Sequence, residues 1–465
     1  MKSATDLQSD PNQGSAKLDG LAEFLQTGGN TLLIKGDAGT GKTTLALQLM
    51  KRLAGKDGGV YISARVSKEK LRKHNAAAVE LVGEDGFVDL RLGNSSFIVS
   101  VMIKAIKGRE KKTKVIVVDT WDAFAKEMEE KERMKAEKSL MALADTTEAR
   151  IIFVSEEPDR TSMEYLVDGI VVLRRIEDSG ALLREFELTK LRGTPIAQHK
   201  HLFTLEAGNF TAFEYNTRRD FTRAHAVKPL NDLRDAYSFG SLKLDDLFGG
   251  IPKGSTFALV YDGNVHYASL RIVELLSIIN ALNLGHGAFL LPLPASPLQE
   301  ISERIRPFVS REAFNNSFAV ASMERDSDRV KPPFYGIGAD TDHELSGRIT
   351  ELIEKVRKNS KTGNVLTVES IVQVESTFAS SSNTVLEGLS ARISKIQATS
   401  NDALLVMLHS DAQMKSRFLA MSRRYARIFM KDRATVIVGE KPSTEPYVLE
   451  HDDLNPLLPR LTRIV

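Results

Sequence analysis

A glycine-rich segment that ends in a lysine and a hydroxyl residue is the part of the sequence best suited to bind phosphate. Its eight consecutive residues fit the pattern G-x-x-x-x-G-K-[ST]: Gly36, Asp37, Ala38, Gly39, Thr40, Gly41, Lys42 and Thr43. Glycines let the backbone curl so that N–H groups point at phosphate oxygens, and the helix expected from Thr44 adds partial positive charge. We predict that these eight residues and Thr44 bind ATP, with the Lys42 ammonium between the β- and γ-phosphates.

A carboxylate that can serve the metal of such a site follows further along the chain. Four β-branched residues, 115–118, are followed by Asp119. At the carboxyl end of a parallel strand this side chain can reach Mg²⁺ or its water shell. Without other signals, Asp119 could equally well be an ordinary residue at the end of a strand. Downstream of a complete phosphate loop, we predict Thr43 and Asp119 as Mg²⁺ ligands, and Lys42 and Asp119 as catalytic residues.

Short apolar runs alternate with amphipathic helical stretches around these residues. We expect strands over 31–35, 59–63, 114–119, 150–154 and 169–174, and an antiparallel pair over 169–175 and 182–191. A single charged helix is expected over 124–144. Strands joined by helical crossovers predict an α/β fold with a mainly parallel sheet flanked by helices and ending in a β-hairpin.

The sequence also repeats itself. Residues 17–21 (KLDGL) reappear at 243–247 (KLDDL), an offset of 243 − 17 = 226. The apolar run before Asp119 has its best counterpart before Glu369, an offset of 369 − 119 = 250, and we assign the extra length to a loop insertion near 324–347. Two tandem α/β domains are therefore predicted.

The second copy has lost the chemistry of the first. At an offset of 226, Asp262, Val265, Tyr267 and Ala268 replace the three loop glycines and the lysine, while Ser269 stands for Thr43. Such a loop has neither the amide cradle nor the cation. We predict a domain that does not bind ATP.

These segments resemble the KaiC-like branch of the RecA-type ATPases. The resemblance rests on the phosphate loop, VIVVDT at 115–120, LVDGIVVL at 166–173, ELTKLRGTP at 187–195 and LDDLFGGIPKGS at 244–255. The tandem arrangement also resembles the archaeal gas-vesicle regulators of the GvpD type. The resemblance implies two RecA-like domains. From the repeat and the polar stretches of the sequence we place them at 17–225 and 239–465, with a flexible N-terminus at 1–16 and a linker at 226–238. It further implies that Lys190 and Arg192 contact the γ-phosphate of a neighbouring subunit, so that the chain forms a homo-oligomer through its N-terminal domain.

One departure from that family concerns hydrolysis. The family carries paired glutamates after its second strand, whereas Arg65 and Val66 stand here. Neither can accept a proton from water at neutral pH, and general-base catalysis typically contributes about 10²–10⁴-fold. We expect a weak ATPase at most. Asp122, Glu156 and Glu69 are the candidate substitute bases.

Composition narrows the class of protein. Lys and Arg number 63 and Asp and Glu 61, a net charge of +2, which does not favour a protein that coats nucleic acid. There is no cysteine, so disulfides and thiolate metal sites are excluded. The start of the chain lacks the apolar region of a signal peptide, and charged residues interrupt its most apolar stretch, 257–282. We expect a cytoplasmic protein without a membrane span.

Three functions stay open on this evidence. The first is a nucleotide-dependent regulator whose second domain, a pseudo-ATPase, binds a protein partner or supports assembly. The second is a RecA-like DNA recombination or repair ATPase, for which the basic cluster at 104–114 would contact nucleic acid. The third is a scaffold that ATP merely stabilises.

Overall fold

The computed structural model describes residues 16–55, 59–74, 82, 86–91, 97–107, 114–157, 161–213, 228–294, 296–323, 332–378, 382–399, 401–451 and 458–465. The chain divides into two compact units. Unit 1 comprises Met1–Glu214 together with Arg463–Val465, and unit 2 comprises Tyr215–Thr462. The flexible segment expected at 1–16 lies, except for residue 16, outside the described residues.

Unit 1 is an α/β unit. Its strands are β1 (Thr31–Gly36), β2 (Val60–Ser63), β3 (Phe87–Asp89), β4 (Val115–Asp119), β5 (Arg150–Ser155), β6 (Gly169–Asp178), β7 (Ala181–Leu191), β8 (Lys200–Thr204) and β9 (Thr211–Ala212). Its helices are α1 (Ala16–Thr27), α2 (Lys42–Ala54), α3 (Lys68–His74), α5 (Ile98–Lys107), α6 (Trp121–Ala125), α7 (Glu130–Thr147) and α8 (Ser162–Leu166).

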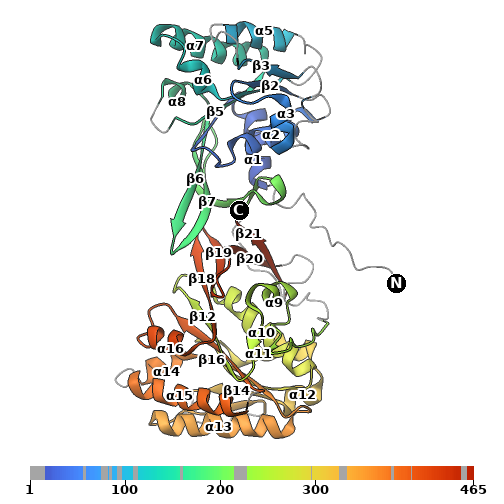
Figure 1. Ribbon diagram of the computed structural model, residues 1–465, viewed down its shortest axis with the longest axis vertical. Helices are drawn as coiled ribbons and strands as arrows, with labels where there is room; N and C mark the ends of the chain where they lie inside the picture. The colour runs from blue at the N-terminus through green and yellow to red at the C-terminus, as the bar shows by residue number, and fades with distance from the viewer. Residues whose placement is uncertain are drawn as a thin grey trace, which may run out of the picture. The chain divides into compact units, whose positions relative to one another are not determined.

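The strands of unit 1 form one sheet in the order β3-β2-β4-β5-β1-β6-β7-β8-β9. The first six are parallel, and β7 returns antiparallel along β6. Figure 1 shows β6 and β7 as the long hairpin of this sheet. Helices α1 and α2 bury their apolar side chains on one face of the sheet, and α5, α6 and α7 on the other. The parallel order brings the carboxyl ends of β1, β2, β4 and β5 to one edge, where ligands bind in such sheets.

Unit 2 repeats this architecture. Its strands are β10 (Ala236–Tyr237), β11 (Ile251–Pro252), β12 (Ser255–Tyr261), β13 (Gly287–Leu291), β14 (Phe318–Ser322), β15 (Phe334–Gly336), β16 (Val365–Ser370), β17 (Ala403–His409), β18 (Arg424–Lys431), β19 (Ala434–Lys441), β20 (Tyr447–His451) and β21 (Pro459–Arg463). Its helices are α9 (Leu242–Phe248), α10 (Tyr267–Asn283), α11 (Leu298–Ile305), α12 (Arg311–Asn316), α13 (Asp342–Asn359), α14 (Ile371–Thr377), α15 (Ser382–Thr399) and α16 (Lys415–Met421).

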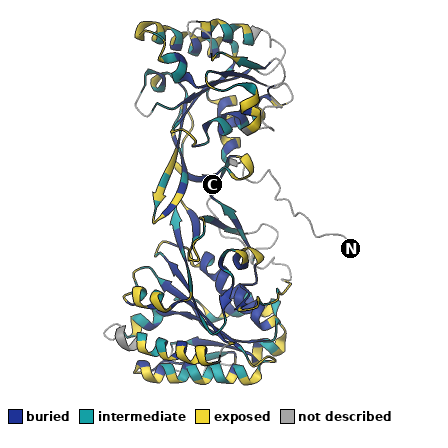
Figure 2. Ribbon diagram, in the orientation of Figure 1, coloured by how far each residue is buried: buried dark blue, intermediate teal, exposed yellow. Residues whose placement is uncertain are grey.

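The large sheet of unit 2 has the order β15-β14-β13-β16-β17-β12-β18-β19-β20-β21. Apart from the added edge strand β15, this order matches that of unit 1 strand for strand. Helices α9 to α12 cover one face and α13 to α16 the other, and Figure 2 shows buried strands beneath helices such as α13 whose outer sides are exposed. The predicted fold class, two tandem α/β units with mainly parallel sheets that are flanked by helices and that each end in an antiparallel hairpin, is confirmed.

Three local expectations differ from the structure. The helix expected over 124–144 is two helices, α6 and α7, separated by a turn. The insertion expected as a loop near 324–347 contains β15 and the start of α13, where the Thr341 hydroxyl accepts a hydrogen bond from the Glu344 N–H. Residues 228–238, expected within the linker, pack on unit 2: Tyr237 is buried, and the Leu230 N–H donates to the Asn280 side chain.

No helix among the residues that the structure describes is both long enough and apolar enough to cross a membrane.

Candidate nucleotide site in unit 1

The phosphate loop connects β1 to α2, and its glycines meet a steric requirement. Gly36, Gly39 and Gly41 all have positive φ, at 151°, 76° and 101°. A Cβ on Gly36 would lie 2.3 Å from the carbonyl oxygen of Leu173 on β6, and one on Gly41 would lie 2.9 Å from Leu205. The loop therefore needs residues without a side chain at these positions.

Lys42 is the first residue of α2, and its side chain turns back over the loop. Its Nζ donates to the Asp37 carbonyl at 2.7 Å and lies 3.6 Å from Glu156 Oε1. Only 5% of the lysine is exposed. Burial lowers the pKa of Lys42, and the carboxylates of Glu156 and Asp119 oppose that shift. A buried ammonium directed at the loop is suited to bind a polyphosphate.

The two predicted metal ligands lie together. Thr43 Oγ1 donates to Asp119 Oδ2 at 2.7 Å, across the gap between α2 and β4. The buried hydroxyl of Tyr61, on β2, donates to the same oxygen at 2.5 Å. Burial raises the pKa of Asp119, although hydrogen bonds from Thr43 and Tyr61 and the charge of Lys42 counteract it.

This donor set fits Mg²⁺ bound together with phosphate. Magnesium takes oxygen ligands, usually one or two from protein and the rest from substrate phosphates and water. Within the described part of the chain, no group of three or more His, Asp or Glu residues could hold a metal by itself. Thr43 and Asp119 would thus hold the ion beside the β- and γ-phosphates, whose charge it would neutralise.

Of the three candidate bases, Glu156 is the one that the structure places in contact with Lys42. It follows β5 and forms ion pairs with Lys42 and with Arg65. Asp122 instead accepts hydrogen bonds from the Ser155 hydroxyl, at 2.8 Å, and from the Glu156 N–H. Glu69 lies exposed on α3. Arg65, which stands where the KaiC-like ATPases carry a glutamate, forms an ion pair with the Glu156 carboxylate.

Arg175 and Arg184 also reach the loop, and the sequence reading missed them. Both guanidinium groups donate to the Gly39 carbonyl, at 2.8 and 3.2 Å. Burial lowers the pKa of Arg184, and the charge of Arg175 lowers it further. The two residues face each other on β6 and β7. This pairing of residues nine apart becomes visible only once the hairpin register is known.

Lys190 and Arg192 lie away from this loop. Lys190 pairs with Ile170 on β6, which pairs with Leu33 on β1, three residues before the loop begins at Gly36. Its Nζ donates to the carbonyls of Glu164 and Val167, at 3.0 and 2.6 Å. Arg192 forms an ion pair of 2.9 Å with Asp168. The structure does not bring either residue to the phosphate loop of its own unit.

The equivalent loop of unit 2 is one residue out of the predicted register. Helix α2 begins at Lys42 and α10 at Tyr267, an offset of 267 − 42 = 225. The preceding strands end at Gly36 and Tyr261, which gives the same offset. Tyr267 therefore stands for Lys42 and Ala268 for Thr43, so the predicted match of Ser269 to Thr43 is wrong.

The corrected register changes which residues replace the cradle. Tyr261, Asn264 and His266 now take the places of the three glycines. Asp262 corresponds to Asp37, which the complete loop also contains, so its charge does not distinguish the two loops. The two loops differ instead in the lysine and in the hydroxyl predicted to bind the metal, which Tyr267 and Ala268 replace in unit 2.

The carboxylate equivalent to Asp119 is also absent. Val115 and Val117 pack on the α2 face, whereas on β16 it is Leu366 and Val368 that pack on the α10 face. The offset here is 366 − 115 = 251, so Ser370 takes the place of Asp119.

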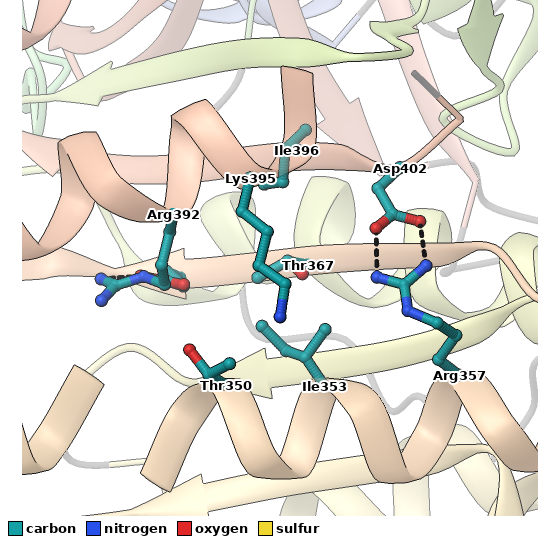
Figure 3. A pocket seen from close by; sticks show the side chains of 9 residues that line it. Thr350, Ile353, Arg357, Thr367, Arg392, Lys395, Ile396 and Asp402 are labelled. Carbon is teal, nitrogen blue, oxygen red and sulfur yellow. Dashed lines mark hydrogen bonds and ion pairs between the residues drawn. The ribbon is translucent and has the colours of Figure 1, made fainter. Parts of the chain in front are cut away.

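Glu369 faces the other side of the sheet. It is fully buried and accepts a hydrogen bond of 2.8 Å from Arg392 on α15. Both residues line a cavity between α13, α15 and β16, beside an ion pair of Arg357 and Asp402 (Figure 3). Glu369 is thus a paired core residue on the face away from the loop.

Of the basic cluster at 104–114, residues 108–113 lie outside the described residues.

Comparison with known proteins agrees with the site. Residues 22–189 match the family model described as the P-loop domain of the GvpD gas vesicle protein. Protein GvpD2 of Halobacterium salinarum is 23% identical over 449 residues, which cover 90% of this chain and 89% of that protein. Protein GvpD1 of the same organism is 26% identical over 292 residues, 58% of this chain and 54% of that protein.

A solved structure of a KaiC-like protein from Pyrococcus horikoshii OT3 is also similar. It is 23% identical and aligns with a TM-score of 0.35 over 40% of this chain and 89% of its own.

Proposed function

We propose that this chain, whose residues 22–189 match the P-loop domain of the GvpD gas vesicle protein, is an ATP-binding regulatory protein. Unit 1 binds Mg-ATP through residues 36–44 and Asp119. Unit 2 is a pseudo-ATPase that docks a protein partner or supports assembly. The observation that carries this proposal is a contrast between the two units. In unit 1, Lys42 and Asp119 are buried and Thr43 donates to Asp119, whereas unit 2 has other residues at all three positions.

Hydrolysis is slow or depends on assembly. Arg65 stands where the family carries a base, and Glu156, the candidate base that contacts Lys42, is held by two cations. A homo-oligomer formed through unit 1 would bring Lys190 and Arg192 of one copy to the nucleotide of the next. Turnover near one per second that disappears in Arg65→Ala would contradict this view of hydrolysis.

The similarity to GvpD gas vesicle proteins supports a role connected with gas vesicles. We propose that this role is regulatory and that the partner is a protein rather than nucleic acid. A cytoplasmic location suits a protein that depends on ATP and has no cysteine.

The test measures molar mass by light scattering and ATP turnover, each with and without Mg-ATP and DNA. A regulator changes its mass or partner binding with Mg-ATP, and Lys42→Ala stays folded but loses that response. Steep DNA stimulation of turnover would favour the recombination ATPase instead. Loss of stability in Lys42→Ala with no nucleotide response in the wild type would favour the scaffold.

A further inference from the structure

We propose that Arg65 is the residue by which unit 1 distinguishes ATP from ADP. It binds the terminal phosphate of ATP, and Glu156 is its partner when that phosphate is absent. The proposal rests on nucleotide binding at the loop of unit 1, and adds to it a residue that reads the state of the nucleotide.

The sheet order places Arg65 and Glu156 on either side of the metal carboxylate. Arg65 follows β2, Glu156 follows β5, and Asp119 ends β4, which lies between those two strands. Ser63 pairs with Asp119, and Asp119 with Val154. The ion pair of Arg65 with Glu156 therefore spans the strand that carries the metal carboxylate, at the edge where the phosphates are expected.

A local turn holds the backbone on both sides of Arg65. The Ser63 hydroxyl donates to the Val66 carbonyl at 2.7 Å and accepts from the Val66 N–H at 3.1 Å. The Ala64 N–H donates to the Asp119 carbonyl at 2.9 Å. These bonds fix the residues on both sides of Arg65 beside β4, while 54% of its own side chain is exposed. The guanidinium can therefore change partners without a change in the fold.

Glu156 combines a fixed backbone with an exchangeable carboxylate. Its N–H donates to Asp122, which anchors the residue at the end of β5. Its carboxylate contacts both Lys42 and Arg65. A terminal phosphate is an anion of higher charge that the same two cations can share. Lys42 meets phosphate in either nucleotide, whereas Arg65 gains a new partner only when the terminal phosphate is present.

Binding affinities test this directly, with Mg²⁺ present and ADP or the non-hydrolysable analogue AMP-PNP as probes. In Arg65→Ala the affinity for AMP-PNP should fall about tenfold or more, the loss expected for one charged hydrogen bond. The affinity for ADP should stay unchanged. Arg65→Lys should recover part of the loss, and Glu156→Gln should bind AMP-PNP more tightly relative to ADP. The control is Arg91→Ala, which removes an exposed arginine that pairs with Asp89 at the end of β3.

Thermal unfolding of each variant confirms that it is folded. Equal losses of ADP and AMP-PNP affinity in Arg65→Ala, or no loss of either, would overturn the inference while leaving nucleotide binding intact. An unchanged preference in Glu156→Gln would also overturn it. If the wild-type protein binds neither nucleotide, the proposed function fails as well.

Discussion

Asp119 is a carboxylate that is almost completely buried. Two hydroxyl groups, those of Thr43 and Tyr61, donate to one of its oxygens, and Lys42 lies nearby. Burial nevertheless raises its pKa, so the ionised form costs free energy in the folded protein. Such a cost is typical of functional sites, where a bound cation compensates for it.

The first prediction concerns this residue. Asp119→Asn should raise the melting temperature of the nucleotide-free protein at neutral pH, because it removes a buried charge. It should also lower the affinity for Mg-ATP about tenfold or more, because a charged ligand of the metal is lost. Calorimetric titration with and without Mg²⁺ checks the second effect. A variant that is less stable and binds Mg-ATP normally would contradict the assignment.

At the scale of residues, the sequence predicts those functional residues that a local pattern along the chain identifies. The loop, Lys42, Thr43 and Asp119 were found because a consecutive pattern and a strand end define them. Tyr61 and Arg184 were not found, because their contacts with Asp119 and Gly39 join elements that are far apart along the chain. No pattern along one strand reveals such a partner.

At the scale of elements, the register of the second copy was predicted one residue out. The apolar runs before Gly36 and Tyr261 contain no residue that distinguishes adjacent registers, and insertions alter the offset along the chain. A shift of one residue moves every strand side chain to the opposite face. Because of this shift, Ser370 and not Glu369 corresponds to Asp119, and Glu369 lies on the opposite face, where it pairs with Arg392.

The buried pair gives a prediction for unit 2. Arg392→Met would leave Glu369 buried without a partner and should destabilise the protein by about 3–5 kcal/mol. The matched control is Lys395→Met at the same cavity. It removes an ion pair with Glu354 that is about half exposed and should have little effect. Denaturant unfolding with nucleotide binding measured in parallel checks both, and equal losses in the two variants would refute the role of Glu369.

A second prediction for unit 2 concerns pH. Burial within α10 raises the pKa of Glu274 to about 7, while Arg271 acts in the opposite direction. A raised carboxyl pKa stabilises the folded state below the unfolded pKa, and that contribution is lost as pH rises through about 7. Glu274→Gln should therefore be more stable than the wild type at pH 8 and nearly equal at pH 5. The melting temperatures of both proteins, measured from pH 5 to pH 8, check this. A difference between them that stays constant over this range would contradict the prediction.

At the scale of the whole molecule, mixing two variants tests whether Lys190 of one copy acts on the nucleotide of another. Lys42→Ala lacks a working loop but keeps Lys190, whereas Lys190→Ala keeps its loop. If Lys190 acts on a neighbouring copy, each variant alone should hydrolyse ATP poorly, and the mixture should recover part of the wild-type rate. A mixture no faster than the sum of its components would show that Lys190 serves only its own chain, where it holds the carbonyls of Glu164 and Val167.

The most direct test of the account is the number of nucleotides bound by each chain at saturating Mg-ATP, measured by calorimetric titration of the wild type and of Lys42→Ala. The account predicts one per wild-type chain and none in the variant, since only unit 1 combines the cradle, the lysine and the metal ligands. Two nucleotides per chain, or one that persists in Lys42→Ala, would contradict it.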